Sequence, residues 1–530
     1  MPSLAETLRE GYRFEPPVVT LGAALEGDGL VAEPKIALPL SMFNRHGLIA
    51  GATGTGKTKT LQLITEQLSA QGVPVFVADL KGDLSGLAAA AASSPAIEKR
   101  LAQVGTPWEP RACPVDFVSL TGTLGAQLRA TVSSFGPLLL AKVLGLNETQ
   151  TSVLSLVFKV CDDQGLPLLD FDDLRAILKY LSSDEGKPLL EEYGGMSSAT
   201  VGVLLRKMVA LEAQGAEAFF GEPEFDVHDL LHTTRDGRGL VTCLALADVQ
   251  EKPALFSTFM MWMLAELYQN LPEAGDLPQP KLVFFFDEAH LLFRDASKAF
   301  LQQIELVVRL IRSKGVGVFF VTQTPKDLPD EVLAQLGSRI QHALRAHTPD
   351  DEAALKATVR TYPKTEHYDL EETLTSLGIG EAVITGLDRK GRPTPVVAAR
   401  LVPPTSRMAP LSADEMQAEL AESDYLREYG KAVNRESAHE LLAKRLERTA
   451  PPPEPERGPF RGREREGGGG PFRDSAPTRS RSSRAGKAAA GALVGALTGT
   501  MARTVGRELV RGLFGLLGAK PARRTRRSRW

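Results

Sequence analysis

The stretch HGLIAGATGTGKTKT, residues 46–60, decides how this 530-residue chain folds. Its apolar run ends in a glycine at position 51, and a segment with helical character follows from Lys57 to Ala70. The next run, VPVFVADL at 73–80, is again mostly apolar, which is typical of a buried strand. A strand, a helix and a strand at this spacing predict a βαβ unit, and therefore a parallel sheet.

Residues 51–58, GATGTGKT, match the phosphate-binding pattern G-x-x-x-x-G-K-[ST] at every fixed position. Glycines permit the tight turn in which backbone N–H groups at a helix N-terminus surround a β-phosphate. We expect Lys57 to reach the β- and γ-phosphates of ATP and the Thr58 hydroxyl to bind Mg²⁺. A glycine-rich turn before an ordinary helix is the structural alternative. The residues expected to contact the nucleotide are Gly51, Ala52, Thr53, Gly54, Thr55, Gly56, Lys57, Thr58 and Lys59.

Two adjacent acids follow a second strongly apolar run, in LVFFFDEAH at 282–290. A phosphate-binding loop needs an acidic partner for Mg²⁺ at the end of a neighbouring strand. We expect Asp287 to hold Mg²⁺ through water and Glu288 to polarise the attacking water. An ordinary carboxylate at a strand end is the alternative interpretation of each acid.

A third apolar run, GVGVFFVTQ at 315–323, ends in polar residues. There the Gln323 amide is placed to hold the attacking water or to respond to the γ-phosphate. Arginines supplied by a neighbouring subunit often stabilise the transition state of phosphoryl transfer. Arg312 and Arg309, in IELVVRLIRSKG, are the candidates, with Arg339 and Arg345 behind them. For each arginine the alternative is a solvated or salt-bridged side chain.

The fold class predicted from these runs is α/β. Their hydrophobicity is continuous rather than alternating, which indicates strands covered on both faces and a mostly parallel sheet. The later β-rich runs are GLVTCLALA (239–247), KLVFFFDE (281–288), GVGVFFVTQ (315–323) and RIQHALRA (339–346). Residues 125–235 differ, because long Leu-, Ala-, Glu- and Lys-rich patterns predict an α-helical insertion.

These patterns divide the chain into six segments. Pro, Gly, Arg and Ser dominate after residue 450, so that part cannot bury enough apolar area to order itself. The predicted segments are a short lead-in (1–44), an ATPase core (45–124 and 236–403), the α-helical insertion (125–235), a helical segment (404–449), a disordered Pro/Gly/Arg linker (450–484) and an amphipathic basic helix with a tail (485–530).

Taken in this order, the motifs resemble those of the HerA/FtsK superfamily of P-loop motors, especially its bacterial HerA-like members with a helicase domain. The resemblance covers roughly residues 15–400. The stretches that carry it are GATGTGKT, ADLKGDLSGL, ATVSSFGPLLL, LNETQ, FFFDEAHLLF, RLIRSKGVGVFFVTQ and LGSRIQHALRA.

The resemblance implies a RecA-like fold with an additional strand, closing into a homo-hexameric ring that shares its ATP site between protomers. It implies Gln323 as the polar sensor at a strand end. It also favours Arg312 as the arginine acting in trans, because the corresponding arginine of related conjugation motors precedes a Lys/Gly turn into the sensor strand. DNA translocation is expected on the same ground.

Charge is distributed unevenly along the chain. Residues 451–530 carry 18 Lys and Arg against 6 Asp and Glu, whereas residues 1–450 carry a net charge of −15. In 485–518, leucines and other apolar residues recur every fourth position with arginines on another side, which predicts a basic amphipathic helix. Contact with a membrane surface, self-association and a weakly ordered appendage all remain open for this tail.

The compartment expected is the cytoplasm. The first residues lack the apolar core of a secretory signal. Cys113, Cys161 and Cys243 are widely spaced, so no disulfide partner is expected.

Two functions of different classes fit the sequence. The first is an ATPase of the P-loop class that forms a ring and translocates on or unwinds DNA, as the motif set indicates. The second is a nucleotide-switched assembly or remodelling ATPase acting on protein or membrane partners, which the acidic body, the helical insertion and the amphipathic tail favour. A binding module without turnover is a third possibility, and the intact Lys57, Thr58, Asp287 and Glu288 argue against it.

Overall fold

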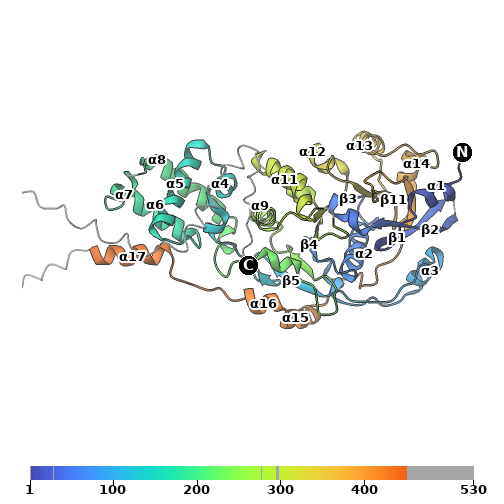
Figure 1. Ribbon diagram of the computed structural model, residues 1–530, viewed down its shortest axis with the longest axis horizontal. Coiled ribbons are helices and arrows are strands. Elements are labelled where there is room, and N and C mark those ends of the chain that lie inside the picture. The colour runs from blue at the N-terminus through green and yellow to red at the C-terminus, as the bar shows by residue number, and fades with distance from the viewer. Residues whose placement is uncertain (1, 28, 192, 276, 294–297, 450–530) are drawn as a thin grey trace, which may run out of the picture. The chain divides into compact units, whose positions relative to one another are not determined.

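One mixed sheet of twelve strands organises the part of the chain that the structure describes (Figure 1). The computed structural model describes residues 2–27, 29–191, 193–275, 277–293 and 298–449, and separates into the units Met1–Ala438 and His439–Trp530. The sheet order is β2-β1-β12-β11-β10-β3-β9-β8-β4-β7-β5-β6. The strands are β1 (Val18–Glu26), β2 (Gly29–Pro39), β3 (Gly47–Ala50), β4 (Val75–Asp79), β5 (Val115–Ser119), β6 (Ala126–Gln127), β7 (Val241–Ala245), β8 (Leu282–Phe286), β9 (Val316–Thr322), β10 (Ser338–Gln341), β11 (Glu381–Thr385) and β12 (Val397–Leu401).

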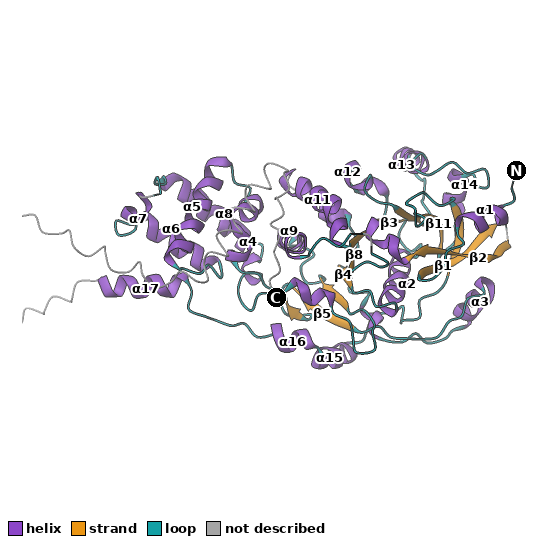
Figure 2. Cartoon of the chain, in the orientation of Figure 1, coloured by secondary structure: helices purple, strands orange, loops and turns teal. Residues whose placement is uncertain are grey.

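Helices pack around this sheet and also form a separate group (Figure 2). Within the first unit they are α1 (Leu4–Gly11), α2 (Lys57–Ala70), α3 (Pro95–Val104), α4 (Val132–Val143), α5 (Glu148–Gln164), α6 (Phe171–Ser182), α7 (Lys187–Glu191), α8 (Ser198–Glu212), α9 (Pro253–Asn270), α10 (His290–Phe293), α11 (Lys298–Ile311), α12 (Asp330–Leu333), α13 (Pro349–Val359), α14 (Leu370–Ser376), α15 (Ala413–Glu422) and α16 (Asp424–Tyr429). Short 3₁₀ turns include η2 (Ser85–Ala88), η5 (Arg312–Lys314) and η6 (Pro325–Asp327).

The parallel part of the sheet explains the continuous apolar runs. From β10 to β6 every neighbouring pair is parallel, whereas β11, β12, β1 and β2 are added antiparallel. Strands β3, β4, β8 and β9 are buried along their whole length. Phe319 of β9 stacks on Phe43 and lies 5.2 Å from Phe285 of β8 between ring centroids. The prediction of an α/β fold with a mostly parallel sheet is therefore confirmed.

The first residues of the chain contribute to the same sheet. The lead-in contains α1, β1 and β2, and Gly22 to Ala24 of β1 pair with Leu401 to Ala399 of β12. At Gly22 a Cβ would come within 2.0 Å of the Arg400 carbonyl oxygen, so only glycine allows the strands to approach this closely. The lead-in is thus an edge of the core sheet rather than an appendage to it.

Five helices, α4 to α8, lie between β6 and β7 in the chain and form one group in Figure 1. A cluster of phenylalanines packs against this group, since Phe135, Phe171 and Phe219 all contact Phe220 with ring centroids 4.5 to 5.3 Å apart. Phe219 also contacts Trp262 of α9 at 5.7 Å. The phenylalanine cluster therefore fixes this group of helices to α9 of the sheet domain.

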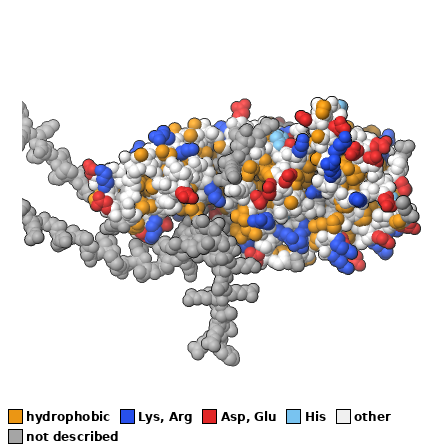
Figure 3. Space-filling view, turned by 90° about the horizontal axis from the view of Figure 1, so that it is seen from above, with side chains coloured by type: hydrophobic (Ala, Val, Ile, Leu, Met, Phe, Trp, Pro, Cys, Tyr) orange, Lys and Arg blue, Asp and Glu red, His pale blue; other side chains and the backbone are white. Residues whose placement is uncertain are grey.

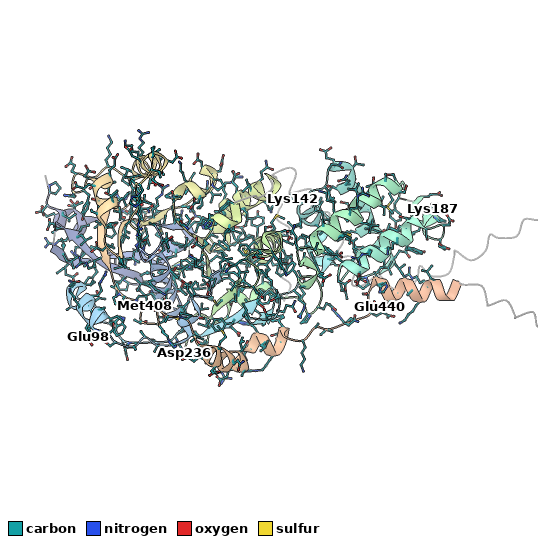
Figure 4. The ribbon with its side chains drawn as sticks, turned by 180° about the vertical axis from the view of Figure 1, so that it is seen from behind. Glu98, Lys142, Lys187, Asp236, Met408 and Glu440 are labelled. Carbon is teal, nitrogen blue, oxygen red and sulfur yellow. The ribbon has the colours of Figure 1, made fainter. Side chains whose placement is uncertain are left out.

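A segment from Pro403 to Leu411, which we call the strap, runs along α2. Three residues of α2 spaced by about one turn hold it. Lys59 Nζ donates to the Met408 carbonyl, Gln62 Nε2 donates to the Ser406 hydroxyl (2.8 Å), and the Glu66 carboxylate accepts the Thr405 N–H (2.8 Å). Met408 is labelled in Figure 4. The strap thus borders the helix that begins at the phosphate-binding loop.

The Glu66→Ala variant is expected to be less stable than the wild type. Glu66 is buried and also accepts bonds from the N–H (3.0 Å) and hydroxyl (2.8 Å) of Ser406, so its removal leaves buried donors without acceptors. We expect a cost of about 3 kcal/mol, lowering the midpoint of thermal unfolding by about 3 °C in a chain of this size. Scanning calorimetry measures it, with the exposed Glu109→Ala as the matched control. Equal midpoints in the two variants would show that the strap contributes no stability here.

Of the second unit the structure describes one helix, α17 (Ala438–Thr449). The predicted linker at 450–484 and the basic helix at 485–530 lie outside the described residues. Within the described ranges, none of the helices combines the length and apolar character needed to cross a bilayer.

Candidate active site

The loop at residues 51–58 joins β3 to α2 in the form that its glycines predict. Gly51, Gly54 and Gly56 have φ angles of 153°, 79° and 113°. At Gly51 a Cβ would also lie 2.5 Å from the His342 Cβ, so glycine is required there on two grounds. No side chain caps the N-terminus of α2 at Gly56. The first N–H groups of α2 are therefore available to an anion, as phosphate binding requires.

Two side chains close this loop on itself. The Thr55 hydroxyl and the Lys57 ammonium both donate to the Ala52 carbonyl, at 2.7 and 3.1 Å. Burial lowers the pKa of Lys57, and the charges of Glu288 and Asp287 oppose that shift. Lys57 therefore lies within electrostatic reach of both acids, although more than 200 residues separate them in sequence.

The sheet register brings the three predicted motifs to one edge. Ala50 of β3 pairs with Thr322 of β9, and β9 in turn pairs in parallel with β8. Gly51 N–H donates to the carbonyls of Thr322 and Gln323, both at 3.2 Å. Ala289 N–H donates to the Val321 carbonyl at 2.8 Å. One strand, β9, thus stands between the strand of the phosphate-binding loop and the strand of the acids, as expected of a RecA-like fold with an additional strand.

Asp287 has the properties of a cation ligand. It is 7% exposed, and its Oδ2 is buried with no hydrogen-bond partner. Burial first, and then the charges of Glu288 and Asp83, raise the pKa of Asp287 to about 7. Among the described residues no group of three or more His, Cys, Asp or Glu side chains is arranged to hold a metal. A metal here would take its other ligands from water and phosphate, which is how Mg²⁺ is usually held.

Glu288 is held in an unusual conformation. Its φ angle is 49°, in the left-handed region that residues other than glycine rarely adopt. Its side chain is buried, Lys81 Nζ forms an ion pair with Oε1, and His290 Nδ1 lies 3.2 Å from Oε2. Strained backbone at a catalytic position is a recurrent feature of active sites. Here it accompanies a buried carboxylate that is paired with Lys81 and whose charge acts on Lys57 of the phosphate-binding loop.

The loop after β4 contributes groups that the sequence predictions did not include. Asp79 accepts the N–H groups of Gly82 (2.8 Å) and Leu84 (3.0 Å), and burial raises its pKa to about 6. This bonding shapes the loop that presents Lys81. Asp83, on the same loop, has a buried Oδ1 with no hydrogen-bond partner. The stretch ADLKGDLSGL, in which alternating charges follow an apolar strand, could have indicated these groups as site residues.

We expect Lys81→Met to lower kcat for ATP hydrolysis by about tenfold at saturating ATP, because the buried Glu288 carboxylate then loses the cation that is paired with it and holds it in place. The effect stays moderate because the Lys81 side chain is 47% exposed and water can partly replace it. Lys81→Arg should retain most of the activity. Steady-state ATPase assays at saturating ATP measure both variants. A methionine variant as active as the wild type would show that Lys81 takes no part in hydrolysis.

The remaining predicted residues lie in different places. Gln323 is exposed at the end of β9, beside Thr322, whose hydroxyl donates to Asp327 at 2.6 Å. Arg309 and Arg312 are exposed near the opposite end of β9, roughly 20 Å from Gln323 at the rise of a strand. Neither arginine can therefore reach the phosphate-binding loop of its own chain.

Three other predicted side chains contact neighbours or solvent away from the acids. The Lys59 ammonium contacts the strap, so only its backbone N–H remains for a phosphate. Arg339 bonds to the Thr361 hydroxyl, and Arg345 is exposed.

Comparison with known proteins places the chain in a family. Residues 29–523 match the family described as Helicase HerA-like C-terminal. The "DNA double-strand break repair helicase HerA" of Saccharolobus solfataricus is 21% identical over 355 residues, 66% of this chain and 64% of that protein. The protein of the same name from Sulfolobus acidocaldarius is 21% identical over 389 residues, 70% of this chain and 68% of that protein. The chain thus spans slightly less than two thirds of the first relative.

The structure is similar to the solved structure of the bacterial conjugative coupling protein TrwBdeltaN70. The two share 14% sequence identity with a TM-score of 0.47, and the match covers 76% of this chain and 98% of that one. VirB4 of Thermoanaerobacter pseudethanolicus has 16% identity, a TM-score of 0.44 and coverage of 77% and 99%. The match of the family model to most of the sequence is decisive for classification: this chain belongs to the Helicase HerA-like C-terminal family.

Proposed function

We propose that this protein is a magnesium-dependent ATPase that forms a homo-hexameric ring and uses ATP hydrolysis to translocate on or unwind DNA. The observation that carries the proposal is the convergence, at one sheet edge, of a complete phosphate-binding loop and two buried acids. Family membership and the similarity to the repair helicases of Saccharolobus solfataricus and Sulfolobus acidocaldarius support DNA as the substrate.

In this proposal each residue of the site has one task. The N–H groups at the start of α2 and the Lys57 ammonium bind the β- and γ-phosphates. Thr58 and Asp287 would hold Mg²⁺, which when bound would neutralise phosphate charge. The Glu288 carboxylate accepts a proton from the attacking water, and the ion pair with Lys81 holds that carboxylate in place. The Gln323 amide, at the end of β9, holds the water or responds to the γ-phosphate.

In this proposal a neighbouring copy in the ring supplies an arginine to the site. Arg309 and Arg312 lie near the opposite end of β9 from the site, so they are placed to act only on a neighbouring copy. A positive group beside the γ-phosphate stabilises the charge of the transition state, and supplying it in trans couples hydrolysis to assembly. Of the two, Arg312 is favoured because it stands directly before the turn into β9.

DNA contact would also depend on the ring. Lys and Arg side chains are interspersed with Asp and Glu over the face seen in Figure 3. Residues 1–450 carry a net charge of −15, and this excess of acidic side chains disfavours a simple basic groove on that face. Loops of several copies facing a central channel would provide the phosphate contacts instead.

The direct test measures ATP hydrolysis by the full chain with and without single- and double-stranded DNA. We expect stimulation of at least about fivefold, decreasing as salt is raised because phosphate contacts release counterions. Negative-stain images with bound nucleotide should show six-fold particles. Equal rates with and without DNA would contradict the proposal and favour the alternative, a remodelling ATPase acting on protein or membrane partners.

A further inference from the structure

A short turn between α14 and β11, residues 377–380, touches the phosphate-binding loop from the side opposite the acids. Gly380 N–H donates to the Thr55 carbonyl at 2.9 Å. A Cβ added at Gly56 would lie 3.3 Å from the Gly380 nitrogen, so the two segments are in van der Waals contact. The turn therefore borders the phosphate-binding loop.

This turn is fixed by charged side chains. Arg100 of α3 donates to the carbonyls of Ile379 (2.8 Å) and Gly380 (3.0 Å). The Glu381 carboxylate accepts the Gly378 N–H at 2.8 Å and is itself paired with Arg400 at 2.8 Å. Together with the bond to Thr55, these hydrogen bonds and this ion pair hold the four-residue turn against the loop. A turn that only connected two elements at the surface would not need so many interactions.

The side chain presented by this turn is apolar and open to solvent. Ile379 is 74% exposed, the highest value for a large apolar residue in the described part of the chain. A single exposed isoleucine is not informative on a mobile surface loop. Here the backbone on both sides of the side chain is fixed, so the apolar group is held in one place beside the phosphate-binding loop.

The sheet order indicates which part of a bound nucleotide would lie next to the turn at 377–380. On one side of β3 lie β9 and β8, whose ends carry Gln323 and the acids that face a γ-phosphate. On the other side lie β10 and β11, and β11 is antiparallel to β10, so the turn at its start reaches the same sheet edge. A triphosphate whose γ-end points to β8 and β9 must extend its nucleoside toward β10 and β11.

We propose that Ile379 is the apolar contact for the purine base of the bound nucleotide, an inference that rests on the proposed ATPase function. The faces of a base are apolar, and nucleotide sites combine such contacts with a few polar groups that fix orientation. The rigid turn holds the contact ready before the nucleotide binds, so little conformational freedom is lost on binding. The same turn, through Gly380 and Thr55, keeps the base contact at a constant distance from the phosphate contacts.

The test separates base binding from phosphate binding. Isothermal titration calorimetry on the full chain with Mg²⁺ compares ATP with inorganic tripolyphosphate, which has no base. We expect Ile379→Ala to weaken ATP binding about tenfold and to leave tripolyphosphate binding unchanged, since the isoleucine side chain touches only the base. In ATPase assays KM for ATP should rise while kcat at saturation stays near the wild-type value. Val209→Ala, at an apolar residue of α8 that is 56% exposed, is the matched control, and Ile379→Leu should restore affinity.

Each other result has a defined meaning. Unchanged ATP affinity in Ile379→Ala would overturn the inference and leave the ATPase proposal intact. Loss of both ATP and tripolyphosphate binding would overturn it as well, because the turn would then support only the phosphate loop. A wild-type chain that binds neither ligand would refute the proposed function, and the base contact with it.

Discussion

Glu288→Gln is expected to reduce kcat for ATP hydrolysis by about 10²- to 10³-fold while ATP binding is retained. The amide has the size of the carboxylate but cannot accept a proton from water. It also cannot form the ion pair with Lys81, so the variant lacks both the base and the charge that orients it. The proposed phosphate contacts come from the loop at 51–58 and do not involve the Glu288 side chain.

Single-turnover hydrolysis and equilibrium ATP binding together test this prediction. ATP should remain bound and uncleaved in Glu288→Gln, and the trapped complex should accumulate. Glu331→Gln, at an exposed position of α12, is the control with the same chemical change. A Glu288→Gln variant that turns over at the wild-type rate would show that another group activates the water.

Local patterns were sufficient to predict the centre of the sheet. Strands β3, β4, β8 and β9 are covered on both faces, so each reads in the sequence as an unbroken apolar run. The position of the acids was equally accessible, because Asp287 and Glu288 directly follow such a run. The roles assigned to these residues stay predictions until activity is measured.

The place of the outer strands in the sheet, and the strap, could not be predicted from local patterns in this way. Strands β1 and β2 are only partly buried, and their place in the sheet depends on pairing with β12, almost four hundred residues later. The strap has no regular pattern, and its bonds to Glu66 join positions that are 339 and 340 residues apart. Interactions of this kind depend on the completed fold, which no short window of sequence contains.

For the same reason, the sequence alone did not predict that Lys81 belongs to the site. Its loop lies in the motif ADLKGDLSGL, yet its partner Glu288 is 207 residues away. The parallel pairing of β4 with β8 brings the two together at their carboxyl ends. Knowledge of the strand order would have predicted the ion pair, because charged residues that follow adjacent parallel strands meet at the same edge.

Lys57→Met is the second change with a large expected effect, and it should differ from Glu288→Gln in kind. Methionine has an unbranched apolar side chain but lacks the cation that reaches the β- and γ-phosphates. We expect ATP affinity to fall by at least about tenfold and kcat by about 10³-fold. Titration calorimetry with ATP and steady-state assays measure the two effects, with the exposed Lys99→Met as control. Wild-type ATP affinity in Lys57→Met would refute the phosphate contact.

The charges around Lys57 predict that this effect is coupled to Glu288. Glu288 and Asp287 both favour the charged form of the buried ammonium. Removing Lys57 alone therefore leaves two buried acids, of which Glu288 is paired with Lys81, whereas removing Glu288 as well reduces the excess negative charge. The double variant Lys57→Met, Glu288→Gln should accordingly unfold at a higher temperature than Lys57→Met, although it is no more active. Additive changes in unfolding temperature would mean that the two side chains do not interact, and that the predicted site is more open than its buried geometry indicates.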